Sequence, residues 1–170
     1  AVGKTALIKE FCKDKDTIFF TAKPESSRLS LQNFSLEILY HYNDISHKVF
    51  SFWEDAFTYI KDKQEDSRLI IVLDEFSEIV DRDIVFMDKF YALIDTSLSR
   101  SNLFFIVSSS NNKFIKEYFT SKSSPYTKKL AGAILLESFL NDESIVKKLA
   151  QESMKTSKGV EQAKFVRVAA

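Results

Sequence analysis

Two continuous apolar runs constrain the fold of this chain more than any other feature. Residues 69–73 read Leu-Ile-Ile-Val-Leu and residues 102–107 read Asn-Leu-Phe-Phe-Ile-Val, and polar residues follow each run. A strand whose side chains are apolar on both faces must be covered on both sides, which is typical of parallel sheets flanked by helices. We therefore expect an α/β domain with a buried parallel sheet.

Other predicted elements alternate with these two runs along the chain. Residues 17–21 are β-branched and aromatic and predict a strand, and residues 133–136 predict another, short strand. Apolar residues spaced by three and four predict helices over residues 4–14, 28–43, 47–64, 83–98, 112–121 and 141–156. Beyond Gly159 no periodicity is clear. Alternating strands and helices predict three layers, with ligands at the carboxyl ends of the strands.

Composition excludes several functional classes. The 170 residues favour one domain, and 24 basic against 24 acidic side chains give zero net charge. Long-range attraction to nucleic acid or an anionic membrane therefore has no support, and direct nucleic-acid binding by this segment is disfavoured, although a local basic patch stays open as an alternative. Cys12 is the single cysteine, so no internal disulfide can form, and no apolar run approaches 18 residues. We expect a cytoplasmic protein outside the membrane.

Gly3-Lys4-Thr5 opens the first predicted helix and matches the end of the phosphate-binding pattern G-x-x-x-x-G-K-[ST]. In that pattern backbone N–H groups and a helix N-terminus surround the phosphates, the lysine reaches the β- and γ-phosphates, and the hydroxyl binds Mg²⁺. Val2 and Ala6 flank the motif and would contact the phosphates through their backbone. Only half of the pattern is present, so an ordinary lysine on a first helical turn remains an alternative.

Asp74 and Glu75 follow the apolar run 69–73 directly. Two carboxylates at the end of a buried strand are costly unless something cationic faces them. In ATPases that have this phosphate-binding loop, the first acid of such a pair holds Mg²⁺ and the second orients the attacking water. Solvated loop residues are the alternative, which becomes weaker when the pair is taken together with Gly3-Lys4-Thr5.

Two further groups of polar residues each have two possible roles. Ser109 and Ser110 lie in a run of three serines and Asn111 after the strand 102–107, where they could sense the γ-phosphate or form a plain turn with a helix cap. Lys128 and Lys129 could supply positive charge to a nucleotide, or form a solvated basic pair.

Several segments, in order from residue 2 to about 140, resemble the prokaryotic (archaeal-type) AAA-like P-loop ATPases of the STAND group. The segments are residues 3–8 (Gly-Lys-Thr-Ala-Leu-Ile), 18–22 (Ile-Phe-Phe-Thr-Ala), 52–57 (Phe-Trp-Glu-Asp-Ala-Phe), 70–76 (Ile-Ile-Val-Leu-Asp-Glu-Phe), 108–110 (Ser-Ser-Ser) and 122–126 (Lys-Ser-Ser-Pro-Tyr).

The resemblance implies a three-layer P-loop NTPase core of the ASCE type with strand order 5-1-4-3-2, spanning residues 1–140. It also implies ATP and Mg²⁺ as ligands. Carried over by position, Lys4 and Thr5 would contact phosphate and metal, Asp74 would serve Mg²⁺, Glu75 would orient water, and Ser109 or Ser110 would be the sensor.

The sequence departs from the family pattern in places. Ser77 replaces a usual proline, and Lys128-Lys129 replaces an arginine pair, which loses the planar fork suited to phosphate. Residues 141–170 are expected to form a helix and tail, and the start of a truncated lid or winged-helix region is the alternative that the resemblance offers. The family's first strand and first loop glycine are absent from this chain. Because that strand lies between the fourth and fifth, two neighbours lose backbone pairing, and we expect the chain to be poorly stable or to fill the position in another way.

Three functions follow as hypotheses. The first is ATP binding with Mg²⁺-dependent hydrolysis in the longer parent protein, driving a conformational switch coupled to a protein partner or to self-association. The second is a catalytically inactive remnant that works as an interaction module. The third, by family analogy alone, is a DNA-associated regulator.

Overall fold

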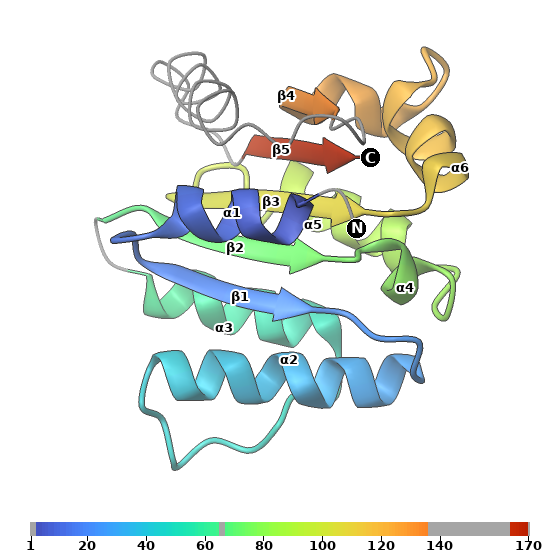
Figure 1. Cartoon of the computed structure of the whole chain (residues 1–170). Coiled ribbons are helices and arrows are strands. Elements are labelled where there is room, and N and C mark those ends of the chain that lie inside the picture. Colours follow the sequence, from blue (N-terminus) through green and yellow to red (C-terminus); the bar gives the residue numbers. More distant parts are fainter. Residues whose placement is uncertain (1–2, 65–66, 136–163, 170) are drawn as a thin grey trace.

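Five strands among the described residues form one parallel sheet with helices on both faces (Figure 1). The computed structural model describes residues 3–64, 67–135 and 164–169. The strand order is β1-β2-β3-β5-β4, and every neighbouring pair is parallel. The strands are β1 (Thr17–Thr21), β2 (Leu69–Asp74), β3 (Leu103–Ser109), β4 (Leu130–Leu135) and β5 (Lys164–Ala169). This arrangement confirms the predicted α/β class with a parallel sheet.

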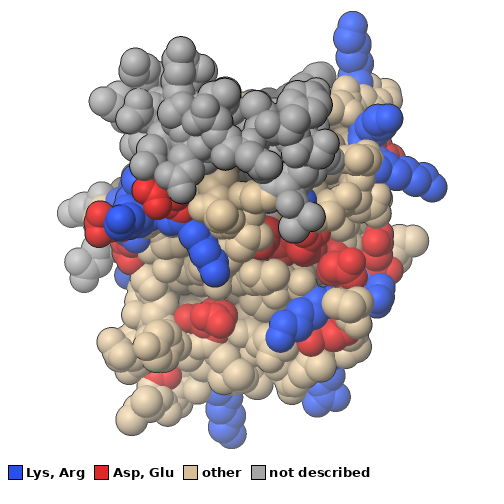
Figure 2. Space-filling view, in the orientation of Figure 1, with Lys and Arg blue, Asp and Glu red and all other residues tan. Residues whose placement is uncertain are grey.

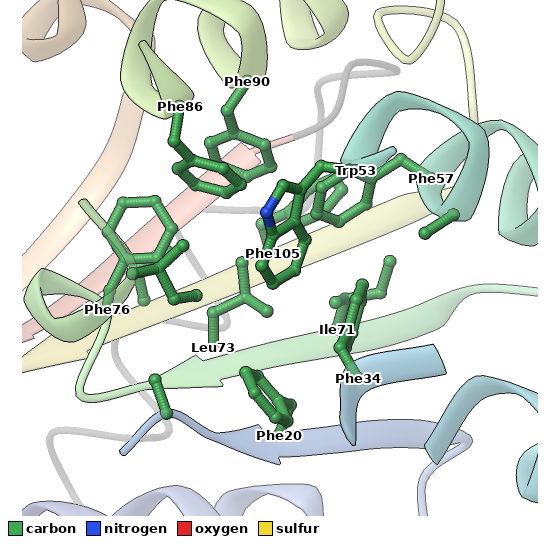
Figure 3. Packing of buried hydrophobic residues seen from close by; sticks show 14 of the residues in the cluster. Phe20, Phe34, Trp53, Phe57, Ile71, Leu73, Phe76, Phe86, Phe90 and Phe105 are labelled. Atoms are coloured by element: carbon green, nitrogen blue, oxygen red, sulfur yellow. The ribbon is translucent and has the colours of Figure 1, made fainter. Parts of the chain in front are cut away.

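The two faces of the sheet carry separate apolar clusters. On one face α2 (Ser27–His41), α3 (Trp53–Lys63) and α5 (Phe86–Asp95) pack over the larger cluster, whose aromatic centre is drawn in Figure 3. On the other face α1 (Lys4–Cys12) covers the smaller cluster with Leu7, Ile8 and Cys12. Alternate residues of β2 divide between the faces: Ile71 and Leu73 enter the larger cluster, and Ile70 and Val72 the smaller. Both clusters therefore depend on the same strands.

The predicted helix over 47–64 begins later than expected, at Trp53. The Asp44 carboxylate accepts hydrogen bonds from the backbone N–H groups of Ser46 and His47, and the Ser35 hydroxyl accepts one from Phe50. These side chains satisfy backbone donors that a helix would otherwise use, so the segment before Trp53 stays a loop. The prediction was wrong at this boundary.

Two other predicted helices are divided or shortened. The segment predicted as a helix over 83–98 contains α5 alone, and the short α4 (Ser77–Val80) precedes it. Residues 112–120 form α6 (Asn112–Ile115) and a π-helical turn, η1 (Lys116–Thr120), and a 3-10 helix, η2 (Pro125–Lys129), leads into β4. The predicted helix over 141–156 lies outside the described residues.

The sheet position between β3 and β4 is the one that the resemblance leaves without a strand, and β5 fills it. β5 pairs with β3 from Phe104↔Lys164 to Ser109↔Ala169 and with β4 on its other side. Residues 164–169, for which the sequence shows no clear periodicity, are thus a strand, and the open position is filled by a later segment of the chain. Two unpaired strand edges offer β5 hydrogen bonds on both sides, and its composition, Lys-Phe-Val-Arg-Val-Ala, suits a strand.

Candidate functional site

The N-terminus of α1 meets the carboxyl ends of β2 and β3 at one edge of the sheet. Gly3 precedes α1 with φ of 77°, a left-handed conformation that glycine adopts without strain. The Lys4 ammonium donates a hydrogen bond to Ser110 Oγ at 2.9 Å, and the Thr5 hydroxyl donates to Asp74 Oδ2 at 2.8 Å. Residues far apart in the chain therefore share one cluster, which we call the edge cluster: Lys4, Thr5, Asp74, Glu75, Ser108 and Ser110.

Asp74 is the buried acid of the edge cluster. It ends β2, is 1% exposed, and uses both carboxylate oxygens, one for Thr5 and one for the Ser108 hydroxyl. The backbone N–H of Phe76 donates to the carbonyl of Ser108 at 2.7 Å, which joins the ends of β2 and β3. The carboxylate is thus held in a fixed place by hydroxyl donors, as a buried acid requires.

Glu75 is held toward Ser110 by an uncommon backbone conformation. Its φ is 53°, in the left-handed region that glutamate seldom adopts, and such strain is found where a site fixes a side chain. The Glu75 carboxylate accepts hydrogen bonds from the backbone N–H of Ser110 at 2.9 Å and from Ser110 Oγ at 2.6 Å. Ser110 Oγ consequently lies between the ammonium of Lys4 and the carboxylate of Glu75.

The serines after β3 have different partners. Ser109 is buried, its hydroxyl bonds to Ser77 Oγ at 2.8 Å, and it accepts the backbone N–H of Asn111. Asn111 caps α6 through Phe114 N. The turn-and-cap interpretation therefore describes Asn111, whereas Ser110 joins the edge cluster.

Ser108 was not among the predicted site residues. Register could have found it: Leu73 pairs with Val107 in the parallel ladder, so Asp74 and Ser108 are the next positions on adjacent strands. The side chain that orients Asp74 is thus implied once β2 and β3 are taken as neighbours.

The remaining predicted residues lie elsewhere or outside the described part. Ala6 is exposed on the first turn of α1, and Val2 falls outside the described residues. The backbone of Lys128 and Lys129 ends η2, just before β4. Because Leu130 pairs with Phe165, which itself pairs with Phe105, this backbone lies toward the amino ends of the strands. The structure does not bring it to the edge cluster, and any role of the lysine pair there stays a prediction.

The edge cluster contains two oxygen atoms that could act as ligands of a hydrated Mg²⁺. Thr5 Oγ1 and Asp74 Oδ2 are hard oxygen donors 2.8 Å apart. Mg²⁺ commonly takes one or two protein oxygens and completes its octahedron with water and phosphate. Within the described ranges no group of three or more His, Cys, Asp or Glu side chains could hold a metal. Thr5 and Asp74 could therefore supply two protein oxygens to such an ion.

On the face shown in Figure 2, acidic and basic side chains are interspersed, in agreement with the zero net charge. No helix among the described residues has the length and apolar character needed to span a bilayer.

Comparison of the chain with protein-family models, with curated proteins and with solved structures finds no match.

Proposed function

We propose that this chain binds ATP with Mg²⁺ at the edge cluster, and that hydrolysis of the bound ATP drives a conformational switch. The observation that carries the proposal is the joining of α1 to two strand ends through the Lys4–Ser110 and Thr5–Asp74 hydrogen bonds. A lysine, a hydroxyl and two carboxylates at the N-terminus of a helix are the groups that a Mg²⁺-bound triphosphate requires.

Each group has a role that its surroundings support. The Lys4 ammonium would bind the β- and γ-phosphates in place of Ser110 Oγ, and the nine-residue helix α1 directs its N-terminal N–H groups to the same place. Thr5 and Asp74 would hold Mg²⁺, which neutralises charge developing on the phosphates. Glu75, released from Ser110, would orient the water that attacks the γ-phosphorus.

Nucleotide binding is tested with Lys4→Ala. Removing an ammonium that pairs with phosphate should weaken Mg²⁺-ATP binding roughly 30- to 100-fold in a titration, because a charge-assisted hydrogen bond is lost. The matched control is Lys9→Ala, an exposed lysine on the same helix, which should bind as the unaltered protein does. Equal ATP affinity of Lys4→Ala and Lys9→Ala would remove the phosphate role from Lys4.

Hydrolysis is tested with Glu75→Gln. The amide keeps the shape of the side chain but cannot act as a base, so ATP binding should persist while phosphate release slows about 100-fold. Glu78→Gln, a nearby exchange on α4, is the control and should leave turnover unchanged. A protein that binds Mg²⁺-ATP but shows no hydrolysis even with Glu75 intact would support the second hypothesis, an interaction module without catalysis.

A further inference from the structure

β4 reaches the sheet through β5. In the strand order β1-β2-β3-β5-β4, β5 separates β4 from β3 and pairs with both. If β5 leaves this position, β3 has an unpaired edge and β4 has no neighbour in the sheet. Insertion of β5 is therefore the contact that joins these parts of the structure.

The register of β5 brings it to the serines of the edge cluster. Ser108 pairs with Val168 and Ser109 with Ala169, at the carboxyl end of β3. The Ser108 hydroxyl bonds to Asp74, and the next residue, Ser110, contacts both Lys4 and Glu75. The backbone that positions these hydroxyls is held by β2 on one side and by β5 on the other.

β5 differs in composition from the other interior strands. β2 reads Leu-Ile-Ile-Val-Leu-Asp and β3 reads Leu-Phe-Phe-Ile-Val-Ser-Ser, as doubly covered parallel strands do. β5 contains Lys164 and Arg167 among its six residues, and Arg167 occupies the register position between Val107 and Ala133. Because two of its six residues are cations, β5 has fewer apolar residues than β2 or β3, and we expect it to open before the rest of the sheet.

We propose that β5 is a reversible strand lock. Its insertion between β3 and β4 organises the edge cluster, and its withdrawal releases β4 and loosens the Lys4–Ser110–Glu75 contacts. Any ligand that needs the ordered cluster then favours insertion, and insertion favours that ligand by the same factor. This last coupling rests on the proposed nucleotide function, whereas the effect of β5 on the edge cluster does not.

The first experiment measures the edge cluster without nucleotide. Val168→Pro removes a backbone donor from a strand paired on both sides, and Val168→Ala keeps that donor as the matched control. Lys4 is only 7% exposed, so an amine-reactive acylating reagent should modify it slowly in the unaltered protein. In Val168→Pro, where the edge cluster is loosened, mass spectrometry should show that Lys4 is acylated about tenfold faster. Lys9, exposed on the same helix, should react equally in all forms. Emission of the buried Trp53 reports whether the larger cluster remains folded.

The second experiment uses the unaltered chain and hydrogen exchange. Amides of β4 and β5 should exchange together and faster than those of β1 and β2, and Mg²⁺-ATP should slow them. Unchanged Lys4 reactivity in a folded Val168→Pro protein would overturn the lock. If that variant unfolds, exchange of β4 and β5 at the rate of β1 and β2 would overturn it instead. If ATP does not bind at all, the nucleotide proposal fails while the acylation result still decides the lock.

Discussion

Buried hydroxyl groups join separate elements of this molecule at single residues. Ser35, fully buried in α2, donates to the Leu31 carbonyl at 2.6 Å and accepts the backbone N–H of Phe50 at 3.1 Å. The second bond ties the loop before α3 to α2. Ser108 makes a similar connection between β3 and the end of β2 through Asp74. Such groups are structural because an unpaired buried donor is expensive.

Ser35→Ala should lower the free energy of unfolding by about 1–3 kcal/mol, since it leaves the Phe50 N–H without its acceptor in a buried place. Urea denaturation measures the change. Ser51→Ala alters an exposed serine of the same loop and should shift the midpoint little. If both variants denature alike, the Ser35–Phe50 bond contributes nothing measurable.

Asp44 gives the loop before α3 a dependence on pH. Hydrogen bonds from the Tyr59 hydroxyl and from Ser46 hold the pKa of this carboxyl well below its usual range. Because the pKa of Asp44 is lower in the folded protein than in the unfolded chain, where it is about 4, the ionised carboxylate stabilises the folded state above about pH 4. This stabilisation is lost as the pH falls below about 4 toward the folded-state pKa. Asp44→Asn should therefore lose less stability than the unaltered protein between about pH 5 and pH 3 in urea titrations. Parallel pH profiles of the two proteins would contradict this assignment.

Among the elements, α3 supplies the centre of the aromatic cluster drawn in Figure 3. Phe57 is fully buried, and its ring centroid lies 5.5 Å from that of Phe34, 5.2 Å from Phe90 and 5.9 Å from Phe105. One side chain thus touches α2, α5 and β3, at distances typical of favourable ring pairs.

Phe57→Ala should destabilise the protein by about 3–5 kcal/mol, because it removes a large buried ring and leaves a cavity. Phe52→Ala, at the N-cap of the same helix, removes a ring that is 61% exposed and should cost far less. Thermal or urea unfolding compares the two. Similar losses of stability would mean either that the aromatic cluster rearranges to fill the space left by Phe57, or that the Phe52 ring makes stabilising contacts of its own.

The sequence predicted the elements that are determined by a local residue pattern. Its predictions failed where contacts with distant parts of the chain determine the structure. β2 and β3 were predicted well because their side chains are apolar on both faces. The start of α3 was wrong because Ser35 and Asp44, which hold the preceding loop, belong to other parts of the chain. β5 was missed because six residues with two cations carry little pattern, and its place depends on the two strands beside it. Convergence of Lys4 with Ser110 and of Thr5 with Asp74 followed from parallel strand ends meeting at one edge.

At the scale of the whole molecule, the five described strands form one continuous sheet, although they do not follow one another in the order that the resemblance implies. Counting from β4 to β1, β5 stands second, where the resembling fold has its first strand. α1 covers the second face of the same sheet through Leu7 and Ile8, which pack with β2 and β3 residues. The carboxyl end of β5 and the start of α1 lie at the same end of the sheet (Figure 1).

This arrangement predicts that β5 can be moved to the front of the chain. Ala169 pairs with Ser109, and Lys4 Nζ lies 2.9 Å from Ser110 Oγ, so the backbones of Ala169 and Lys4 are within roughly 20 Å of each other. A glycine linker of about eight residues spans that distance without being fully extended. A permuted protein that begins with residues 164–169 and continues through the linker into residues 3–163 should keep the Trp53 emission maximum. Its Tm should lie within about 5 °C of the original.

The control is the same permuted protein with Val168→Pro, which removes one ladder hydrogen bond from an interior strand and should melt clearly lower. Calorimetry of the two permuted proteins isolates the contribution of β5, because their composition and chain order are otherwise identical. Melting of the unaltered permuted protein no higher than that of its Val168→Pro form would mean that residues 164–169 do not hold the position between β3 and β4. A higher Tm together with slow acylation of Lys4 would show that strand insertion, and not its place in the chain, orders the edge cluster.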